Sequence, residues 1–167
     1  AAAGDLVSPQ LAARIVWLDA FVTNPDRTHR NPNLLVWQRR PWLIDHGAAL
    51  YAHHDWASVD ETRTRSPFPL VRDHVLLLRS GDLEAADADA AAGLDEGVVD
   101  AALAAVPDDL LLDARRPAEF ADAAAARRRY RDYLLGRLRE PRDFVAVAIE
   151  ARAQKRREPA IARSARR

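Results

Sequence analysis

The stretch that decides the fold reads Asn24-Pro-Asp-Arg-Thr-His-Arg-Asn-Pro-Asn-Leu-Leu-Val36 and continues, after a short polar turn, as Trp42-Leu-Ile-Asp-His-Gly47. Its two apolar runs, at 34–37 and 42–44, have the length of short strands, and the polar residues 38–41 between them are typical of a turn. We therefore predict a β-hairpin. Such a hairpin brings the loop before its first strand next to the loop after its second strand.

Side chains suited to phosphoryl transfer stand at both ends of this hairpin. Asp26 lies in the loop before it, Asn31 and Asn33 come just ahead of the first strand, and Asp45 follows the second. A phosphoryl-transfer site needs one carboxylate to orient the attacking hydroxyl, and an amide oxygen with a second carboxylate to hold Mg²⁺. Each of these residues taken singly is also typical of an ordinary turn, because Asn and Asp favour loops.

The order Asp-Arg-x-x-x-Asn, then Asn-Leu-Leu-Val, then Leu-Ile-Asp-His-Gly resembles the catalytic and metal-binding loops of protein-kinase-like folds, and most closely those of HipA-like kinase domains. The flanking segments 17–24 and 44–50 are similar to those domains as well. The resemblance is specific over residues 15–56 and implies a mainly α fold. The chain would form the helical C-terminal lobe of a kinase-like fold, with one small β-hairpin carrying the catalytic and metal-binding loops.

The resemblance also implies roles for single residues. Asp26 would be the catalytic aspartate and Asp45 the metal-binding aspartate. Asn31 has the family's spacing from Asp26, whereas Asn33 has the family's place directly before the strand. Either could therefore be the second metal ligand, and we favour Asn33 because the strand fixes where its amide points. Weaker candidates for contact with substrate or phosphate are Arg27, His29 and His46, the last of which stands where the kinase pattern Asp-Phe-Gly has Phe.

The implied function is ATP-dependent phosphotransfer to a Ser or Thr hydroxyl of a protein substrate, with ATP and Mg²⁺ as cofactors and an antitoxin-like protein as a further partner. Kinase folds hold the nucleotide with a glycine-rich loop and a lysine in an N-terminal lobe. Only residues 1–7 precede the first predicted helix, and the sole lysine is Lys155. We therefore expect an incomplete ATP site, a chain that is inactive alone, and exposed apolar surface near 37–50, where the missing lobe would pack.

Two other functions fit the sequence. A pseudokinase remnant would act as a protein-binding module and would need no nucleotide lobe. A metal-dependent hydrolase would need converging ligands, and His-His-Asp is not a recognised ligand spacing. The side chains that would take part in such a metal cluster are Asp45, His46, His53, His54 and Asp55.

Composition excludes several classes of function. The 25 basic and 25 acidic side chains cancel, which argues against a nucleic-acid partner. The absence of cysteine excludes disulfides, thiolate metal sites and a cysteine nucleophile. No apolar run approaches the ~18 residues of a membrane span, so we expect a cytoplasmic protein without a membrane partner. The absence of methionine suggests a fragment, a processed product or a trimmed chain.

The rest of the chain is predicted to be helical. Ser8-Pro9 predicts a helix start, since serine caps helices and proline suits the first helical position. Asn24-Pro25 ends that helix. The four tryptophans are expected mostly in the core. Further helices are expected over 68–79, 83–93 (helical or loose), 96–106, 117–138 and 141–152, which gives one domain over 1–152 followed by a basic tail, 153–167, expected to be disordered.

Overall fold

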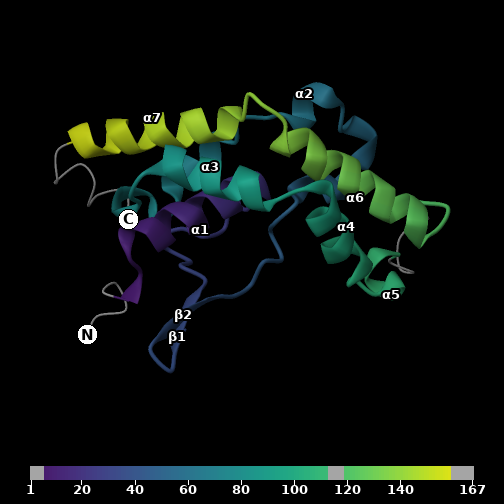
Figure 1. Ribbon diagram of the computed structural model, residues 1–167, viewed down its shortest axis with the longest axis horizontal. Coiled ribbons are helices and arrows are strands. Elements are labelled where there is room, and N and C mark those ends of the chain that lie inside the picture. The colour runs from purple at the N-terminus through teal and green to yellow at the C-terminus, as the bar shows by residue number, and fades with distance from the viewer. Residues whose placement is uncertain (1–5, 113–118, 159–167) are drawn as a thin grey trace.

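The computed structural model describes residues 6–112 and 119–158 (Figure 1). Over these residues the chain is mainly helical, with one small antiparallel hairpin, as the sequence predicts. The strands are β1 (Leu34–Trp37) and β2 (Arg40–Leu43). The α-helices are α1 (Pro9–Phe21), α2 (Glu61–Thr64), α3 (Leu83–Gly93), α4 (Glu96–Ala104), α5 (Asp108–Leu111), α6 (Ala123–Leu138) and α7 (Asp143–Arg157). Short 3₁₀ helices join them: η2 (Tyr51–His54), η3 (Trp56–Ser58), η4 (Pro69–Asp73) and η5 (Leu77–Arg79).

Helix α1 lies at the centre of the larger core. It begins as predicted, with the Ser8 side chain accepting a hydrogen bond from the Leu11 amide at 3.1 Å and Pro9 in the first turn. Most of its side chains are buried, because α1 packs against α3, α6 and α7 and against the short helices η4 and η5. The helix thus has neighbours on several sides and serves as the scaffold for the loop that follows it.

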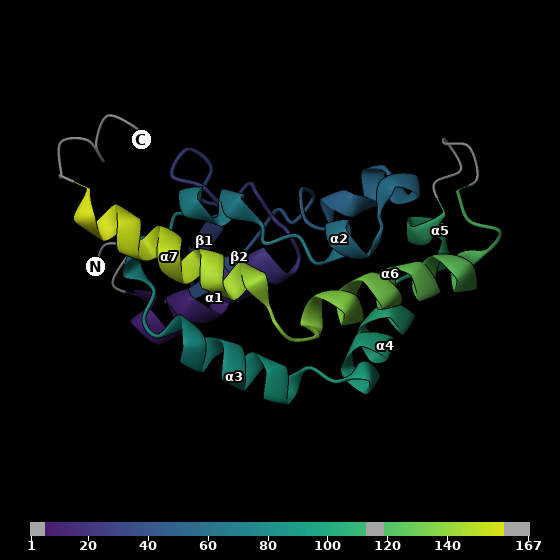
Figure 2. The same ribbon diagram turned by 90° about the horizontal axis from the view of Figure 1, so that it is seen from above.

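A smaller aromatic cluster lies at the other end of the molecule, beside α6 (Figure 2). Trp56 is buried there, and its ring meets Tyr130 at 5.0 Å and Tyr133 at 5.7 Å in edge-on contacts. Edge-on aromatic pairs contribute beyond the apolar area that they bury. This cluster fixes η2 and η3, which continue from the hairpin, against α6.

The buried side chain of Arg137, on α6, links the end of α1 to the segment around α2. It is almost completely buried and donates hydrogen bonds to the carbonyls of Ala20 at 2.9 Å and Phe21 at 2.6 Å, where α1 ends. It also donates to the carbonyls of Thr64 and Ser66, at 2.8 and 3.0 Å. A cation is favourable at a helix C-terminus, where carbonyls lack helical partners. Burial lowers the pKa of the Arg137 guanidinium, which stays charged in this ring of carbonyls.

Two further arginines of α6 hold backbone carbonyls in the same manner. Arg127 donates to the carbonyl of Leu103, in the last turn of α4, at 3.1 Å and to that of Val106, just beyond the helix, at 2.6 Å. Arg129 donates to the carbonyls of Trp56 and Val59, at 3.0 and 2.6 Å. A guanidinium has several donors in a fixed fork, so one side chain can satisfy two loop carbonyls at once. These roles for the arginines of α6 were not predicted from the sequence.

The segment 68–79 differs from the single helix predicted. It forms η4 and η5, and between them His74 is extended and pairs with Thr28 in an isolated β-bridge. The Val75 amide donates to the carbonyl of Arg27 at 2.9 Å. Pairing with the loop before the hairpin removes these backbone groups from helical hydrogen bonding, which is why one continuous helix does not form here.

Helix α7 extends to Arg157, beyond the end predicted near residue 152. One face of α7, which includes Ala148 and Ala151, is buried. Lys155 of the same helix pairs with Asp73 of η4 at 3.7 Å. Tertiary packing of this kind stabilises most helices more than their composition does. Residues 159–167 of the predicted tail, and the predicted helix start at 117, lie outside the described residues. No helix within the described ranges is both long and apolar enough to cross a membrane.

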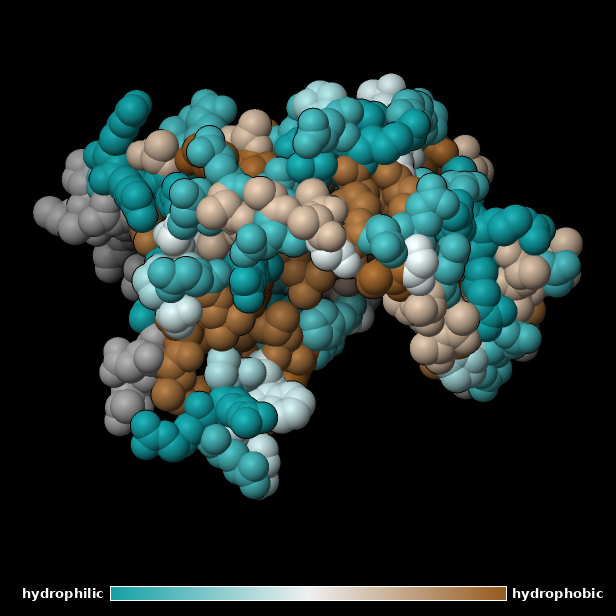
Figure 3. Space-filling view, viewed as in Figure 1, coloured by the Kyte–Doolittle hydropathy of each residue, from teal (hydrophilic) through white to brown (hydrophobic). Residues whose placement is uncertain are grey.

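The hairpin projects from the helical body and exposes apolar side chains. Leu35 pairs with Trp42 across the strands, and these side chains are 48% and 52% exposed. Trp37 is 60% exposed, so Trp37 and Trp42 are not core residues, unlike Trp17 and Trp56. Apolar surface covers the base of the hairpin, whereas its tip is polar (Figure 3). This agrees with the apolar patch expected near 37–50.

Two helical glycines provide a test of how closely the helices pack. A Cβ on Gly136 of α6 would lie 2.7 Å from the Thr64 methyl group, whereas a Cβ on Gly93 of α3 would meet nothing within 4 Å. We expect Gly136→Ala to lower the free energy of unfolding by about 1–3 kcal/mol, because overpacking outweighs the better helix propensity of alanine. Gly93→Ala should leave it unchanged or slightly raised. Urea unfolding of both variants measures this, and equal effects would contradict the close contact of α6 with α2.

Candidate functional site

A buried polar network holds the loop between α1 and the hairpin. Its centre is Asp19 on α1, whose side chain is fully buried. The Asp19 carboxylate accepts hydrogen bonds from Arg27 Nε at 2.5 Å, from His74 Nε2 at 2.9 Å and from Asn24 Nδ2 at 3.0 Å. A buried carboxylate is costly unless it is paired and fully hydrogen-bonded, and this one is both.

The His74 ring has its proton placed by its neighbours. Nδ1 accepts a hydrogen bond from the Leu76 amide at 3.0 Å, so Nδ1 carries the lone pair and Nε2 is left to donate to Asp19. The ring therefore acts as a connector between α1 and the segment that bridges η4 and η5.

Arg27 extends this network to both ends of the hairpin. Its guanidinium donates to the carbonyl of Asn33, directly before β1, and to His46 Nε2 at 3.3 Å, after β2. Because an arginine can only donate, His46 Nε2 is the acceptor. One buried side chain thus positions the residues that enter and leave the hairpin.

The four principal residues predicted for the site lie together at the base of the hairpin. Asp26 Oδ2 accepts hydrogen bonds from Asn31 Nδ2 at 2.7 Å and from Asn33 Nδ2 at 3.1 Å. Asn33 Nδ2 also lies 3.5 Å from the Asp45 carbonyl oxygen. The Asn24 side chain accepts a hydrogen bond from the Asp26 amide at 3.2 Å. This local turn fixes the backbone position of Asp26, the candidate catalytic residue.

Backbone conformation distinguishes two of these residues. Asn33 has a φ of 46° and Asp45 a φ of 52°, both in the left-handed region. Asn and Asp tolerate this region better than most residues, but it remains sparsely populated and clusters at functional sites. Asn33 is buried, in contact with Asp26 and next to the Asp45 backbone, whereas Asn31 is more exposed. Both asparagines reach Asp26, and Asn33 alone of the two also reaches Asp45.

The weaker candidates are placed differently from one another. Arg27 is 1% exposed and its guanidinium faces Asp19, so it is a positioning residue and does not face solvent, where a phosphate would bind. His46 is exposed and lies against Arg27. His29 is exposed and lines an apolar cavity beside the hairpin.

This apolar cavity has a volume of about 520 Å³, within the range of small-molecule sites. It lies between the hairpin and η5, and part of its wall comes from the candidate loop itself, at His29 and Pro32. The aliphatic side chains that line it are Val7, Leu34, Leu35, Val36, Val75, Leu76 and Leu78.

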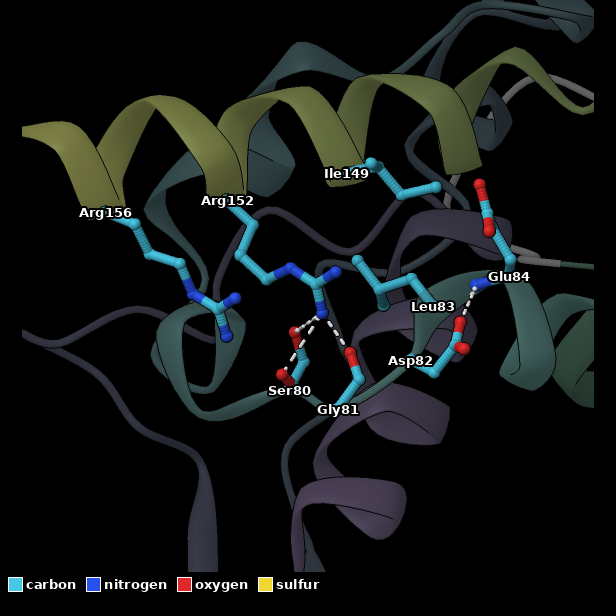
Figure 4. Close-up of a pocket in the computed structure, with 8 residues that line it drawn as sticks. All are labelled: Ser80, Gly81, Asp82, Leu83, Glu84, Ile149, Arg152 and Arg156. Carbon is cyan, nitrogen blue, oxygen red and sulfur yellow. Dashed lines mark hydrogen bonds between the residues drawn. The ribbon is translucent and has the colours of Figure 1, made fainter.

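A second pocket, of about 430 Å³, lies where the start of α3 meets α7 (Figure 4). Arg152 donates from α7 to the carbonyls of Ser80, at 3.1 Å, and Gly81, and Asp82 caps α3 by accepting from the Glu84 amide at 2.9 Å. Acidic and basic side chains both line the pocket, so it has no preference for ions of one sign. Its polar groups hold α7 against α3.

The donor set at the base of the hairpin fits a hard cation. The carboxylates of Asp26 and Asp45 and the amide oxygens of Asn31 and Asn33 are the ligand types that Mg²⁺ prefers. The alternative metal cluster is not assembled: no group of three or more His, Asp or Glu side chains that could hold a metal occurs in residues 6–112 and 119–158. His46 instead contacts Arg27.

Sequence reasoning gave no role to Asp19 or to His74. Asp19 falls among apolar residues of a helix, and a charged side chain there is the one signal that could have drawn attention to it. His74 lies 55 residues further along the chain, so its contact with Asp19 depends on tertiary structure.

Comparisons of the chain with protein-family models, with curated proteins and with solved structures find no match. The chemistry proposed for the site therefore rests on its residues, their geometry and the sequence resemblance described above.

Removing the Asp19 carboxylate should destabilise the fold strongly. Burial alone would raise the pKa of Asp19, but hydrogen bonds from His74 and Arg27 hold it below its ordinary value of 3.8. Asp19→Ala leaves Arg27 buried without its partner, and we expect it to lower the free energy of unfolding by about 3–5 kcal/mol at pH 7. Because the folded-state pKa is lowered, this stabilisation is present at neutral pH and is lost as the pH falls through that pKa. The stability difference between Asp19→Ala and the wild type should therefore shrink as the pH falls below the ordinary aspartate value of 3.8.

The matched control is Asp89→Ala, which breaks an exposed pair with Arg14 in which both side chains are 65% exposed. It should change stability little, since exposed ion pairs contribute little. Urea unfolding at several pH values measures both variants. A similar, small effect for both would contradict the structural role given to Asp19.

Proposed function

We propose that this chain is the catalytic lobe of a HipA-like kinase, which transfers phosphate from ATP to a Ser or Thr hydroxyl of a protein. The observation that supports the proposal is the meeting of Asp26 with the side chains of Asn31 and Asn33 at the base of the hairpin, where Asn33 also lies 3.5 Å from the backbone carbonyl of Asp45. Turn chemistry alone does not require residues from both ends of a hairpin to converge in this way.

Each residue has a role that its surroundings allow. Asp26 would orient the acceptor hydroxyl, and the amides of Asn31 and Asn33 hold its carboxylate in place. An asparagine amide has a donor and an acceptor end, so Asn33 can donate to Asp26 while its oxygen remains available. With the exposed Asp45 carboxylate, that oxygen could hold Mg²⁺, which when bound would neutralise charge on the phosphates.

The nucleotide would need further support. The sole lysine, Lys155, lies on α7 and pairs with Asp73, so it is not placed as the phosphate-anchoring lysine of a kinase. We therefore propose that ATP binds this chain weakly and that a nucleotide-binding lobe or an antitoxin-like protein would complete the site. The apolar hairpin is the surface on which such a partner would pack, in the cytoplasm and without a membrane or nucleic-acid partner.

A second candidate function is that of a pseudokinase remnant acting as a binding module. The observation that favours it is the exposure of Leu35, Trp37 and Trp42 on the hairpin. Exposed apolar groups that adjoin one another often mark protein interaction sites. This function needs the same surface as the kinase but does not need the carboxylates.

Titration of Mg²⁺-ATP by calorimetry separates the two. For the kinase lobe, we expect weak binding that depends on Mg²⁺ and becomes at least about tenfold weaker in Asp45→Ala, a loss of ~1.4 kcal/mol or more. The matched control Asp89→Ala removes an exposed carboxylate far along the chain and should bind as the wild type does. Equal affinity in all three proteins, or no binding by any of them, would contradict the metal-binding role of Asp45 and favour the binding module.

A further inference from the structure

Two histidine rings meet on the surface that follows the candidate site. His53 and His54 end the short helix η2, and their Nε2 atoms lie 3.2 Å apart. Their ring centroids are 4.2 Å apart and their planes are nearly perpendicular, at 80°. His54 is exposed and His53 is partly exposed, so both Nε2 atoms belong to side chains that a dissolved ion can approach.

The separation of the two nitrogens matches that of two ligands on one metal ion. Zinc binds imidazole nitrogen at about 2.0–2.1 Å with tetrahedral geometry, which places two such nitrogens about 3.3 Å apart. To direct both lone pairs at one ion, the ring centroids must separate from 4.2 Å to about 5 Å. Side-chain rotation at an exposed position can provide this shift. The two nitrogens are at hydrogen-bonding distance in the structure, so a bound ion would replace that hydrogen bond.

The backbone beneath the two rings is well held. The His53 amide donates to the Leu50 carbonyl at 2.8 Å, and the Leu50 amide donates to Val22, at the end of α1, at 2.6 Å. Ala52 between them is buried in the aromatic cluster, and the Tyr51 ring packs edge-on against His54 at 5.0 Å. Binding therefore orders little besides the two rings, which keeps its entropic cost low.

We propose that His53 and His54 form a surface site for a divalent transition metal of the zinc, copper or nickel type, with water completing the coordination. Imidazole suits these ions, whereas Mg²⁺ prefers the oxygen ligands at Asp26 and Asp45. The site is thus chemically distinct from the one proposed for phosphotransfer and does not depend on it. A bound ion would brace η2, the segment that connects the Asp45 loop to the aromatic cluster around Trp56.

The test is calorimetric titration of Zn²⁺ into the wild type, His53→Ala, His54→Ala and the matched control His29→Ala, which removes an exposed histidine elsewhere. We expect one equivalent of Zn²⁺ to bind the wild type and His29→Ala, and to bind at least about tenfold more weakly to either variant of the pair. Zn²⁺ should also raise the Tm of the wild type and not that of His54→Ala, since an ion that binds only the folded state stabilises it. Both variants change surface side chains, and circular dichroism confirms that they fold.

Three results would overturn the proposal. The first is Zn²⁺ affinity in His53→Ala and His54→Ala equal to that of the wild type. The second is loss of binding in Asp45→Ala with no loss in His54→Ala, which would assign the ion to the oxygen-rich site. The third is no binding by the wild type at millimolar Zn²⁺, which would mean that the two rings are joined only by a hydrogen bond.

Discussion

The buried ion pair between Asp19 and Arg27 is the interaction on which the candidate site depends. Arg27 lies in a polar loop that contributes little apolar surface of its own, and the pair attaches this loop to α1, the best-packed helix. A buried pair is tolerated only when each remaining polar atom finds a partner. No buried side-chain nitrogen or oxygen of the described residues lacks one. Full satisfaction makes the arrangement specific: moving the loop would leave several groups unpaired at once.

The ion pair also explains how a hairpin of low intrinsic stability can carry an ordered site. A two-stranded hairpin with both faces exposed is barely stable by itself. Here the residue before β1 and the residue after Asp45 are both held by the same guanidinium. Asn33 and Asp45 keep their left-handed backbone conformations because the hydrogen bonds of the surrounding network hold the chain on either side of the hairpin in place. Rigidity at the base of the hairpin therefore comes from the buried network below it, while the tip remains free to contact other molecules.

Local signals in the sequence were enough to predict some of these features. The Ser8-Pro9 start of α1, the hairpin at 34–43 and the meeting of Asp26 with Asn31 and Asn33 all follow from caps, turns and short apolar runs. These features depend on residues close together in the chain. The hypotheses about ATP, Mg²⁺ and a protein acceptor came from the family resemblance and remain predictions.

Other features could not be predicted, because distant segments decide them. The break at His74 arises from pairing with Thr28, and the long α7 arises from burial against the core. Nor does the sequence alone show that Arg27 points inward. Arg27 lies two residues before His29, a candidate substrate contact, and its position in the sequence therefore suggests a phosphate ligand. The structure shows instead that it pairs with the buried carboxylate of Asp19.

The arginines of α6 give the fold an unequal response to acid. Arg127, Arg129 and Arg137 hold backbone carbonyls, and acid changes the charge of neither partner in such a contact. The loop of the candidate site is held instead through a carboxylate, which acid can neutralise. Acidification below the ordinary aspartate value of 3.8 should thus loosen this loop while the contacts of these three arginines with backbone carbonyls persist.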